Sequence, residues 1–456
     1  MKFKNLIVAT LAMGLNNSVM SSAHASVIAI IDSGTDLNHQ ELKNKKWVNT
    51  RDPDDAVDND NNGYIDDVNG WNFAENNNQL FDKRLLGSFS PDAYRYFEIQ
   101  TKMMTGEATE GEVSWLRMRL QDPKFLAELG VFGNFIHGTH VAGISAKLSE
   151  QAKIMGLKII PTKAPTVGGG RESAYFGISA NGGVTDAIIK GGLRLLASQQ
   201  GKQLESIGKY VAAKKARLAN CSFGTSTAAA KKILGPILRG LLRREPTAQE
   251  LEGYSIYFVN EVVKAAGTLV NPSKSTLFVI AAGNDGMNND QFPTSPANIK
   301  QDNTITVAAT NGYKKIANFS NYGARMVEVA APGVGILSAI PGNQYVTVSG
   351  TSQAAPFVTG VAGMMLDLNP ALSHSDVKRI LMGTSDQKDF LRGVVMSGGI
   401  VNAGRAALAA RLAKTLGVTR AIESARMQVT DVRSAYYESD GMKSEGYVIP
   451  MPGLFN

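Results

Sequence analysis

The chain has 456 residues, of which 43% are hydrophobic and 19% are charged, and its formal net charge is +7. This balance is typical of a globular chain that buries a sizeable core. The basic residues are scattered, with only short clusters such as Lys214-Lys215 and Arg243-Arg244. A solvated surface is therefore expected, and nucleic acid is excluded as a partner.

The N-terminus has the pattern of an export signal. Lys2 and Lys4 precede an apolar run from Leu6 to Leu15, and Ala23-His24-Ala25 fits the rule for signal peptidase. The run is too short for a stable membrane anchor, and no later run of about twenty apolar residues follows. We therefore expect residues 1–25 to be a signal peptide. The mature chain would begin at Ser26, be secreted or periplasmic, and have no membrane partner after cleavage.

The first element of the mature chain is a predicted buried strand. Val27 to Ile31 is an apolar, β-branched run of the kind that parallel sheets bury. Asp32-Ser33-Gly34 follows at its end, where open α/β sheets place their ligands. Asp32 is therefore a candidate site residue, although an aspartate here is also a common helix cap.

An acidic, Asn-rich segment follows and resembles the front half of a calcium loop. Oxygen-bearing residues alternate along it, and Gly63 suits the sharp turn. We expect a structural Ca²⁺ held by the side chains of Asp58, Asp60, Asn62 and Asp66 and by the Tyr64 carbonyl. Asn69 stands where a full EF-hand has glutamate. A turn without metal, which this composition also favours, is the alternative.

Residues from about 79 to 132 are expected to form a helical insertion. Apolar residues recur at helical spacing over Tyr94–Met104 and Glu112–Leu129. The simpler interpretation is a surface addition, and the alternative is a lid or an intramolecular inhibitory segment. His137 follows in His137-Gly138-Thr139-His140-Val141-Ala142-Gly143-Ile144 and is expected to open an apolar helix.

The middle of the chain alternates predicted strands and helices. Strands are expected at Lys153–Ile160, at Arg217–Cys221 and at Phe278–Ala282, the last of which leads into Gly283-Asn284. A glycine-rich stretch at 167–170 lacks the context of a phosphate loop. Helices are expected at Val184–Leu196 and Ile207–Lys215, split by a polar stretch from Ser198 to Gly201. A further helical hairpin, Ala228–Arg244 with Ala248–Ala266, would form an insertion at about 225–270 outside the sheet.

The stretch Ser349-Gly350-Thr351-Ser352-Gln353-Ala354-Ala355-Pro356 has the features of a nucleophile site. A predicted strand, Tyr345–Val348, precedes it, and a helix is expected from Ala354 with Pro356 in its first turn. A serine at the partly positive end of a helix has backbone N–H groups beside it that can stabilise an oxyanion. It also needs a base and an orienting acid.

Asp32, His137 and Ser352 occur in the chain order found in subtilisin, and H-G-T-H-V-A-G-I, A-A-G-N and G-T-S-x-A-x-P flank the expected positions. The chain therefore resembles the subtilisin-like serine proteases from Ser26 to about Gly417. The resemblance implies a three-layer α/β sandwich with a mostly parallel central sheet and helices on both faces.

The resemblance also implies roles for individual residues. Ser352 would be the nucleophile, His137 the base, Asp32 the orienting acid and Asn284 the oxyanion donor. Ser222, Phe223 and Gly224 would then pair with the backbone of a protein or peptide substrate.

Two alternative functions remain open, and the sequence departs from the family pattern in several places. The same residues would suit an acyl transferase such as a peptide macrocyclase, and the same fold could serve a non-catalytic binding protein. Because Ser26 lies so close to Asp32, the expected mature chain leaves no room for the N-terminal propeptide usual in the family. The tail at 418–456 lies outside the resemblance and is expected to be an arm, a partner segment or disordered. Gln353 replaces the methionine of many relatives, which should reduce oxidative inactivation.

Overall fold

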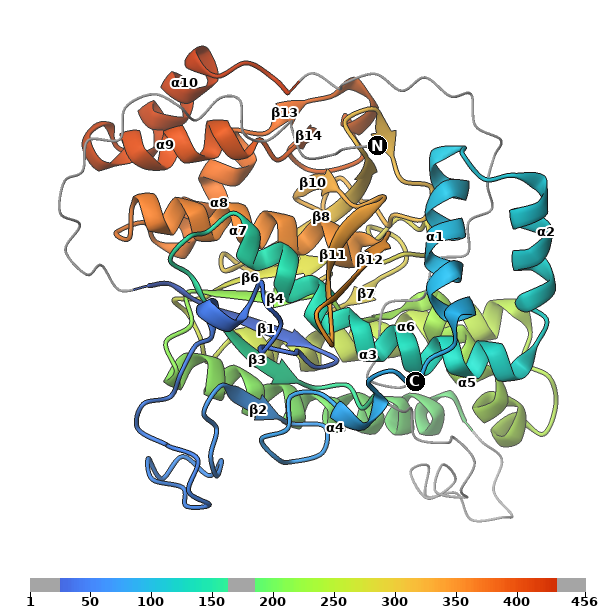
Figure 1. Cartoon of the computed structure of the whole chain (residues 1–456). Coiled ribbons are helices and arrows are strands. Elements are labelled where there is room, and N and C mark those ends of the chain that lie inside the picture. Colours follow the sequence, from blue (N-terminus) through green and yellow to red (C-terminus); the bar gives the residue numbers. More distant parts are fainter. Residues whose placement is uncertain (1–24, 163–184, 433–456) are drawn as a thin grey trace.

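The fold is built around one large sheet in the computed structural model, which describes residues 25–162 and 185–432 (Figure 1). The expected signal peptide apart from Ala25, the glycine-rich stretch at 167–170 and the chain end at 433–456 lie outside the described residues. Within the described ranges, no helix is both long and apolar enough to cross a membrane.

In the described part of the chain, ten strands form the central sheet, in the order β13-β14-β10-β8-β6-β4-β1-β3-β2 with β9 paired to β8. Neighbours are parallel except for the pairs β13–β14 and β8–β9. The strands are β1 (Val27–Asp32), β2 (Gly70–Asn72), β3 (Lys153–Lys158), β4 (Leu218–Cys221), β6 (Leu277–Ala281), β8 (Thr304–Asn311), β9 (Lys315–Ile316), β10 (Val329–Pro332), β13 (Asp386–Gln387) and β14 (Gly399–Ile400). Two antiparallel pairs stand apart: β5 (Thr225–Ser226) with β7 (Thr294–Ser295), and β11 (Ile336–Ile340) with β12 (Gln344–Val348).

Helices cover both faces of the sheet, as predicted. Ile28 and Ile30 of β1 pack on one side and Ala29 and Ile31 on the other, in two separate apolar clusters. The first side holds α3 (Pro123–Lys147), α7 (Thr351–Leu368), α8 (His374–Gly383), α9 (Ala403–Leu416) and α10 (Val418–Gln428). The second side holds α4 (Asp186–Ala213) and α6 (Ala248–Val270), with α5 (Thr227–Leu242) packed on α6. The three-layer, mostly parallel α/β architecture is therefore confirmed.

The predicted helical insertion is joined to the helix that carries His137. It contains α1 (Pro91–Thr105) and α2 (Glu110–Arg119), and α3 then begins at Pro123 with Asp122 as its N-cap. The single helix predicted over Glu112–Leu129 was therefore wrong, because a proline with an aspartate before it starts a new helix there. His137 does not open a helix but lies in the middle of α3.

The polar stretch from Ser198 to Gly201 does not split a helix, because α4 runs through it without a break. Its glycine instead allows close packing against α6. A Cβ at position 201 would lie 3.1 Å from Cβ of Ala265, and one at 208 would lie 2.3 Å from the Leu269 carbonyl oxygen. Gly201, in the predicted break, and Gly208, in the predicted helix after it, therefore both serve a helix–helix contact.

The first part of the predicted tail is folded. Residues 418–428 form α10, which packs on α9 and α8. Asp431 beyond it pairs with the buried Arg405 at 2.7 Å, and Arg405 also pairs with Asp386 at 3.1 Å. Short 3-10 turns complete the described chain at η1 (Lys43–Lys45), η2 (Lys83–Leu85) and η4 (Asp389–Leu391).

Candidate active site

Asp32 and His137 are hydrogen-bonded at the carboxyl edge of the sheet. Asp32 is the last residue of β1, and Nδ1 of His137 lies 2.7 Å from its Oδ1. Gly138 lets α3 come this close, since a Cβ there would lie 2.2 Å from the Gly34 carbonyl oxygen. The Asp32 side chain is buried, and the His137 side chain is 12% exposed. The second nitrogen of the imidazole is therefore left for another partner.

Ser352 lies in the first turn of α7, which starts at Thr351 rather than at the predicted Ala354. Among the described residues, the Ser352 backbone N–H has no hydrogen-bond partner. The Ser352 hydroxyl donates to the Ser222 carbonyl at a long distance of 3.4 Å. Within the described residues, it makes no hydrogen bond to His137. Catalytic hydrogen bonds are often long or broken without substrate.

Asn284 is held in one orientation beside Ser352. Its Oδ1 accepts hydrogen bonds from the Thr351 N–H at 2.9 Å and from the Thr351 hydroxyl at 2.8 Å. Its Nδ2 lies on the side of Gly350, 3.3 Å from where a Cβ of that residue would be. The amide N–H₂ and the Ser352 N–H are thus two donors near the same turn, which is the arrangement that stabilises an oxyanion.

The predicted substrate-binding segment lies against the nucleophile. The Ser222 hydroxyl donates to the Ser352 carbonyl at 3.1 Å and accepts from Asn220 Nδ2 at 2.9 Å. Pro356 has no N–H for that carbonyl, so the hydroxyl takes the place of a helical hydrogen bond. Phe223 is buried in the core cluster of the second side, and Gly224 leads into β5. Any substrate pairing by this segment would use its backbone.

Two buried side chains near the site are not poised for acid–base or thiol chemistry. His140 lies one turn beyond His137, and its Nε2 is 3.1 Å from the carbonyl oxygens of Ile336 and of Val346. Burial lowers the pKa of His140 to about 3, so the ring is neutral at ordinary pH. Burial also raises the pKa of the Cys221 thiol, which agrees with the expected role of Cys221 as a strand residue.

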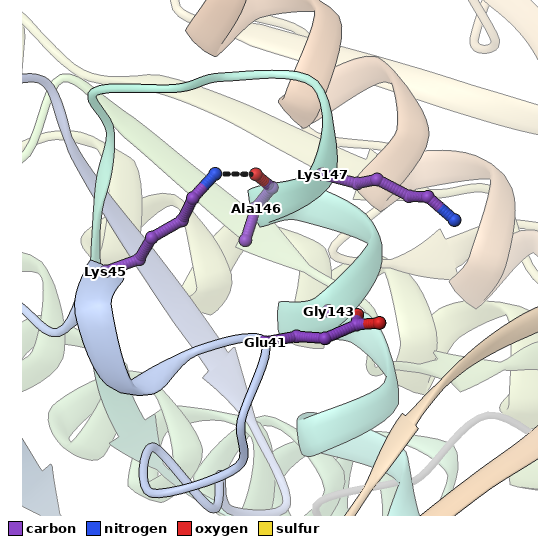
Figure 2. A pocket seen from close by; sticks show the side chains of 5 residues that line it. All are labelled: Glu41, Lys45, Gly143, Ala146 and Lys147. Carbon is purple, nitrogen blue, oxygen red and sulfur yellow. Dashed lines mark hydrogen bonds between the residues drawn. The ribbon is translucent and has the colours of Figure 1, made fainter. Parts of the chain in front are cut away.

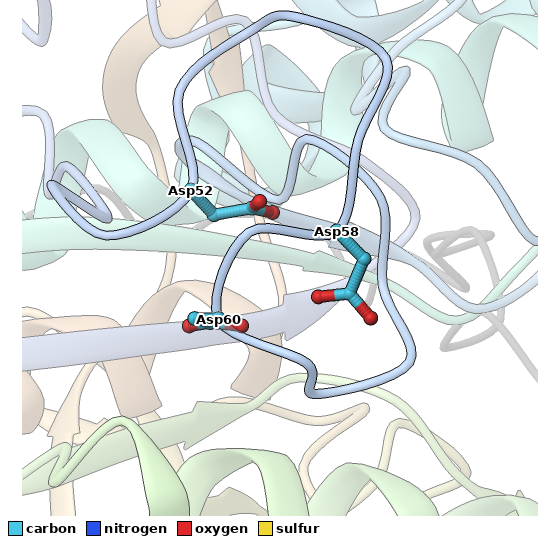
Figure 3. Close-up of side chains that lie close together, drawn as sticks. All are labelled: Asp52, Asp58 and Asp60. Atoms are coloured by element: carbon cyan, nitrogen blue, oxygen red, sulfur yellow. The ribbon is translucent and has the colours of Figure 1, made fainter.

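The acidic loop brings two of the predicted ligand residues together with a third carboxylate that was not predicted (Figure 3). Asp58 and Asp60 meet Asp52, with one carboxylate oxygen of each within 4.8 Å of the others. Asp66 lies outside this group, and its carboxylate accepts the N–H groups of Asp55 and Ala56 at 3.0 Å.

The side chains of Asn62 and Tyr64, the other two residues of the predicted set, have local partners. Asn62 Oδ1 accepts from the Tyr64 N–H at 2.7 Å, and Asn62 Nδ2 donates to Asp67 at 3.0 Å. The Tyr64 ring packs against Trp71 and Phe73.

The group of Asp52, Asp58 and Asp60 fits a hard cation. Asp60 Oδ2 pairs with Lys214 at 3.0 Å, but Asp60 Oδ1 is buried and has no partner in the described ranges. Although burial opposes it, hydrogen bonds from Asn49 and Lys214 hold the pKa of Asp60 below its usual value. Clustered carboxylate oxygens with an unpartnered buried atom suit Ca²⁺.

A pocket of about 210 Å³ lies near the C-terminal end of α3, and none of the predicted site residues lines it. Glu41, Lys45, Gly143, Ala146 and Lys147 form its walls (Figure 2). Lys45 Nζ donates to the Ala146 carbonyl at 2.6 Å. Burial lowers the pKa of this lysine. Its contact with a terminal carbonyl is that of a helix cap.

Three residues that contact the candidate site were not identified from the sequence. Thr351 fixes Asn284, Ser33 contacts both Asp32 and α3, and Asp52 completes the acidic group. Asp52 belongs to the same acid-rich segment as Asp58, and the composition of that segment is the sequence signal for it. The contacts of Ser33 and Thr351 depend on tertiary structure, and no local pattern indicates them.

Known proteins resemble this chain over part of its length. Alkaline elastase YaB of Bacillus sp. (strain YaB) is 31% identical over 249 residues, which are 55% of this chain and 50% of that protein. Subtilisin DY of Bacillus licheniformis is 43% identical over 108 residues, which are 24% of this chain and 38% of that protein. The chain thus spans about half or less of the length of these curated relatives.

Solved structures also align with most of this chain. A cold adapted subtilisin-like serine proteinase is 19% identical with a TM-score of 0.41, over 85% of this chain and 89% of that one. A lanthipeptide protease is 18% identical with a TM-score of 0.44, over 84% and 87%. The profile of the subtilase family matches residues 133–411, which include His137, Asn284 and Ser352. Since this match extends over more than half of the sequence, the chain belongs to the subtilase family.

Proposed function

We propose that the protein is a serine endopeptidase that cleaves peptide bonds through an acyl-enzyme on Ser352. The observation that carries this proposal is the 2.7 Å pair of Asp32 and His137 at the sheet edge that also presents Ser352. Family membership supports the reaction class, and the donors of Asn284 and of the Ser352 N–H support the oxyanion step.

The proposed reaction starts with a rotation of the Ser352 hydroxyl away from the Ser222 carbonyl and toward His137. His137 takes the proton as Ser352 attacks the scissile carbonyl, and Asp32 stabilises the resulting imidazolium through Nδ1–H. The oxyanion accepts hydrogen bonds from Asn284 and from the Ser352 N–H. His137 then protonates the leaving amine, and water releases the acyl group by the same steps in reverse.

Extended protein or peptide chains are the proposed substrates. The segment from Ser222 to Gly224 follows β4, and the Phe223 side chain is buried, so the segment offers backbone groups rather than side chains. Backbone pairing of this kind accepts many sequences, because the main chain is common to all of them.

We also propose a structural Ca²⁺ held by Asp52, Asp58 and Asp60, with the buried Lys214 paired to Asp60 Oδ2. The ion would neutralise the acidic loop and would take no part in the chemistry. Export is proposed from the motif at residues 1–25, and mass spectrometry of the mature protein should give Ser26 as its first residue.

The proposed activity is tested by a fluorophosphonate probe and by casein digestion, with Ser352→Ala as the control. Wild type should be labelled and should digest casein, and Ser352→Ala should do neither. Asn284→Ala should still react with the probe, but at a lower rate, since the loss of one oxyanion donor costs about 10²–10³ in turnover. Folded wild type that is not labelled would contradict the proposal.

Product analysis separates hydrolysis from acyl transfer. Peptide substrates should give free carboxylates in the presence of added amines. Mainly amide or cyclic products would favour the transferase alternative instead.

The metal site has its own test. Removal of calcium by a chelator should lower the melting temperature of wild type, and Asp60→Asn should remove most of this difference. Glu150→Gln, at an exposed position outside the acidic group, serves as the charge-matched control. A chelator effect that is equal in wild type and Asp60→Asn would contradict the assignment.

A further inference from the structure

The Ser33 hydroxyl lies between two backbone groups of the helix that carries His137. Its Oγ donates to the Asn134 carbonyl at 2.6 Å and accepts from the Gly138 N–H at 3.3 Å. In a regular α-helix these two groups, four residues apart, bond to each other. The hydroxyl, whose residue is only 2% exposed, therefore contacts both ends of the helical turn that encloses His137.

The backbone of the same residue holds the acid. The Ser33 N–H donates to Asp32 Oδ1 at 2.7 Å, and that oxygen is also the one that His137 Nδ1 contacts at 2.7 Å. Ser33 thus binds Asp32 through its main chain and the turn around His137 through its side chain. The other oxygen of this carboxylate, Asp32 Oδ2, is buried and has no hydrogen-bond partner in the described ranges. Both contacts therefore fall on Oδ1.

We infer that Ser33 is a positioning residue that fixes the distance and orientation between Asp32 and His137. This inference rests on the proposed function, since its effect on rate passes through that pair. Without the hydroxyl, Asn134 and Gly138 have only each other as partners, and α3 loses a direct link to the end of β1. Small misplacements of a catalytic group can cost about 10²-fold in rate.

The kinetic test compares Ser33→Ala with Ser33→Thr, which keeps a hydroxyl. Ser33→Ala should lower kcat by about 10- to 100-fold with KM changed little, because the substrate contacts remain. Ser33→Thr should recover most of the rate. Ser145→Ala is the matched control. Ser145 is buried like Ser33 but lies in α3, and its hydroxyl has no partner among the described residues. It should behave like wild type.

A second readout needs no turnover. In ¹⁵N-labelled protein, the proton on His137 Nδ1 should give a low-field signal, which His137→Gln identifies by removing it. Ser33→Ala should lose or shift this signal, whereas Ser33→Thr and Ser145→Ala should keep it. If wild type proves inactive, the proposed function fails while this signal still tests the role of Ser33.

Two results would overturn the inference. One is a folded Ser33→Ala protein with the rate and the signal of wild type. The other is a Ser33→Ala protein that is less stable but keeps the low-field signal, with a rate loss that only matches its unfolded fraction. In that case the hydroxyl would merely support the fold.

Discussion

The two helical additions to the central sheet differ in what they contact. The first region, comprising α1, α2 and the start of α3, shares one apolar cluster with the β11–β12 hairpin, and this cluster includes Ile136 and Val348. Ile136 precedes His137, and Val348 lies shortly before Ser352. The second region, α5 with α6, packs its cluster on α4, and all buried members belong to these three helices.

The position of a helical addition determines which parts of the molecule its packing can affect. The first region joins the helix of His137 to the strand that leads to Ser352, so a defect in its packing can reach both residues. The simpler prediction, a surface addition at 79–132, does not describe this contact. In the second region only α5 resembles a surface addition. The hairpin predicted to lie outside the sheet was wrong for α6, which packs on the sheet through Ala266, Leu269 and Val270.

The largest contrast is expected from removal of one buried ring in each region. Phe132 and Phe258 are 0% and 1% exposed, and Phe→Ala in a core typically costs about 3–5 kcal/mol. Both variants should therefore unfold at lower urea concentration. Below the unfolding transition, Phe132→Ala should also show about tenfold lower kcat, and Phe258→Ala should not. Equal kcat values in the two variants would remove the distinction between the regions.

The pH dependence of stability tests the contact between α3 and the hairpin. His140 joins them, and its pKa is lowered by burial from 6.5 to about 3. The unfolded chain therefore binds a proton at a higher pH than the folded chain does, so stability is complete above about pH 6.5 and falls as the pH drops toward 3. The loss should be on the order of a few kcal/mol.

His140→Gln should weaken this dependence, and urea unfolding at pH 7, 6, 5 and 4 provides the measurement. The variant will be less stable at pH 7, so the slopes are compared and not the absolute values. Identical slopes would mean that other groups account for the acid sensitivity.

The smallest effect is expected from two matched ion pairs at helix starts. Glu112 pairs with Lys102 at 2.7 Å in the first region, and Glu250 pairs with Arg244 at 2.6 Å in the second. Each pair, together with a capping N–H, lowers the pKa of its glutamate to about 2. The stabilisation is therefore present above about pH 4.5 and is lost as the pH falls toward 2.

Glu112→Gln and Glu250→Gln should each lower the melting temperature slightly at pH 7 and by less in high salt, because both pairs face solvent. Neither should change kcat. A clear change in kcat for Glu112→Gln alone would extend the influence of the first region to its outer surface.

The sequence was informative where the signal is local. Runs such as Val27–Ile31 predicted the strands of a parallel sheet, and the flanking motifs identified Asp32, His137, Asn284 and Ser352, whose roles stay proposals. It was less informative about continuity. The polar stretch Ser198–Gly201 suggested a break in α4, yet the helix continues through it and packs on α6. The contacts of Ser33 were invisible because they join residues about a hundred positions apart.

The continuous α3 has a consequence for how length can vary in this protein. An α-helix turns by about 100° per residue. One residue added between Phe132 and His137 would therefore rotate the imidazole away from Asp32 if the Phe132 ring stayed in its cluster. Upstream of Asp122, in contrast, extra residues change no angle at His137. Insertions and deletions are therefore tolerable in the connections around α1 and α2. Between Pro123 and His137, in contrast, the number of residues cannot change without turning His137 away from Asp32.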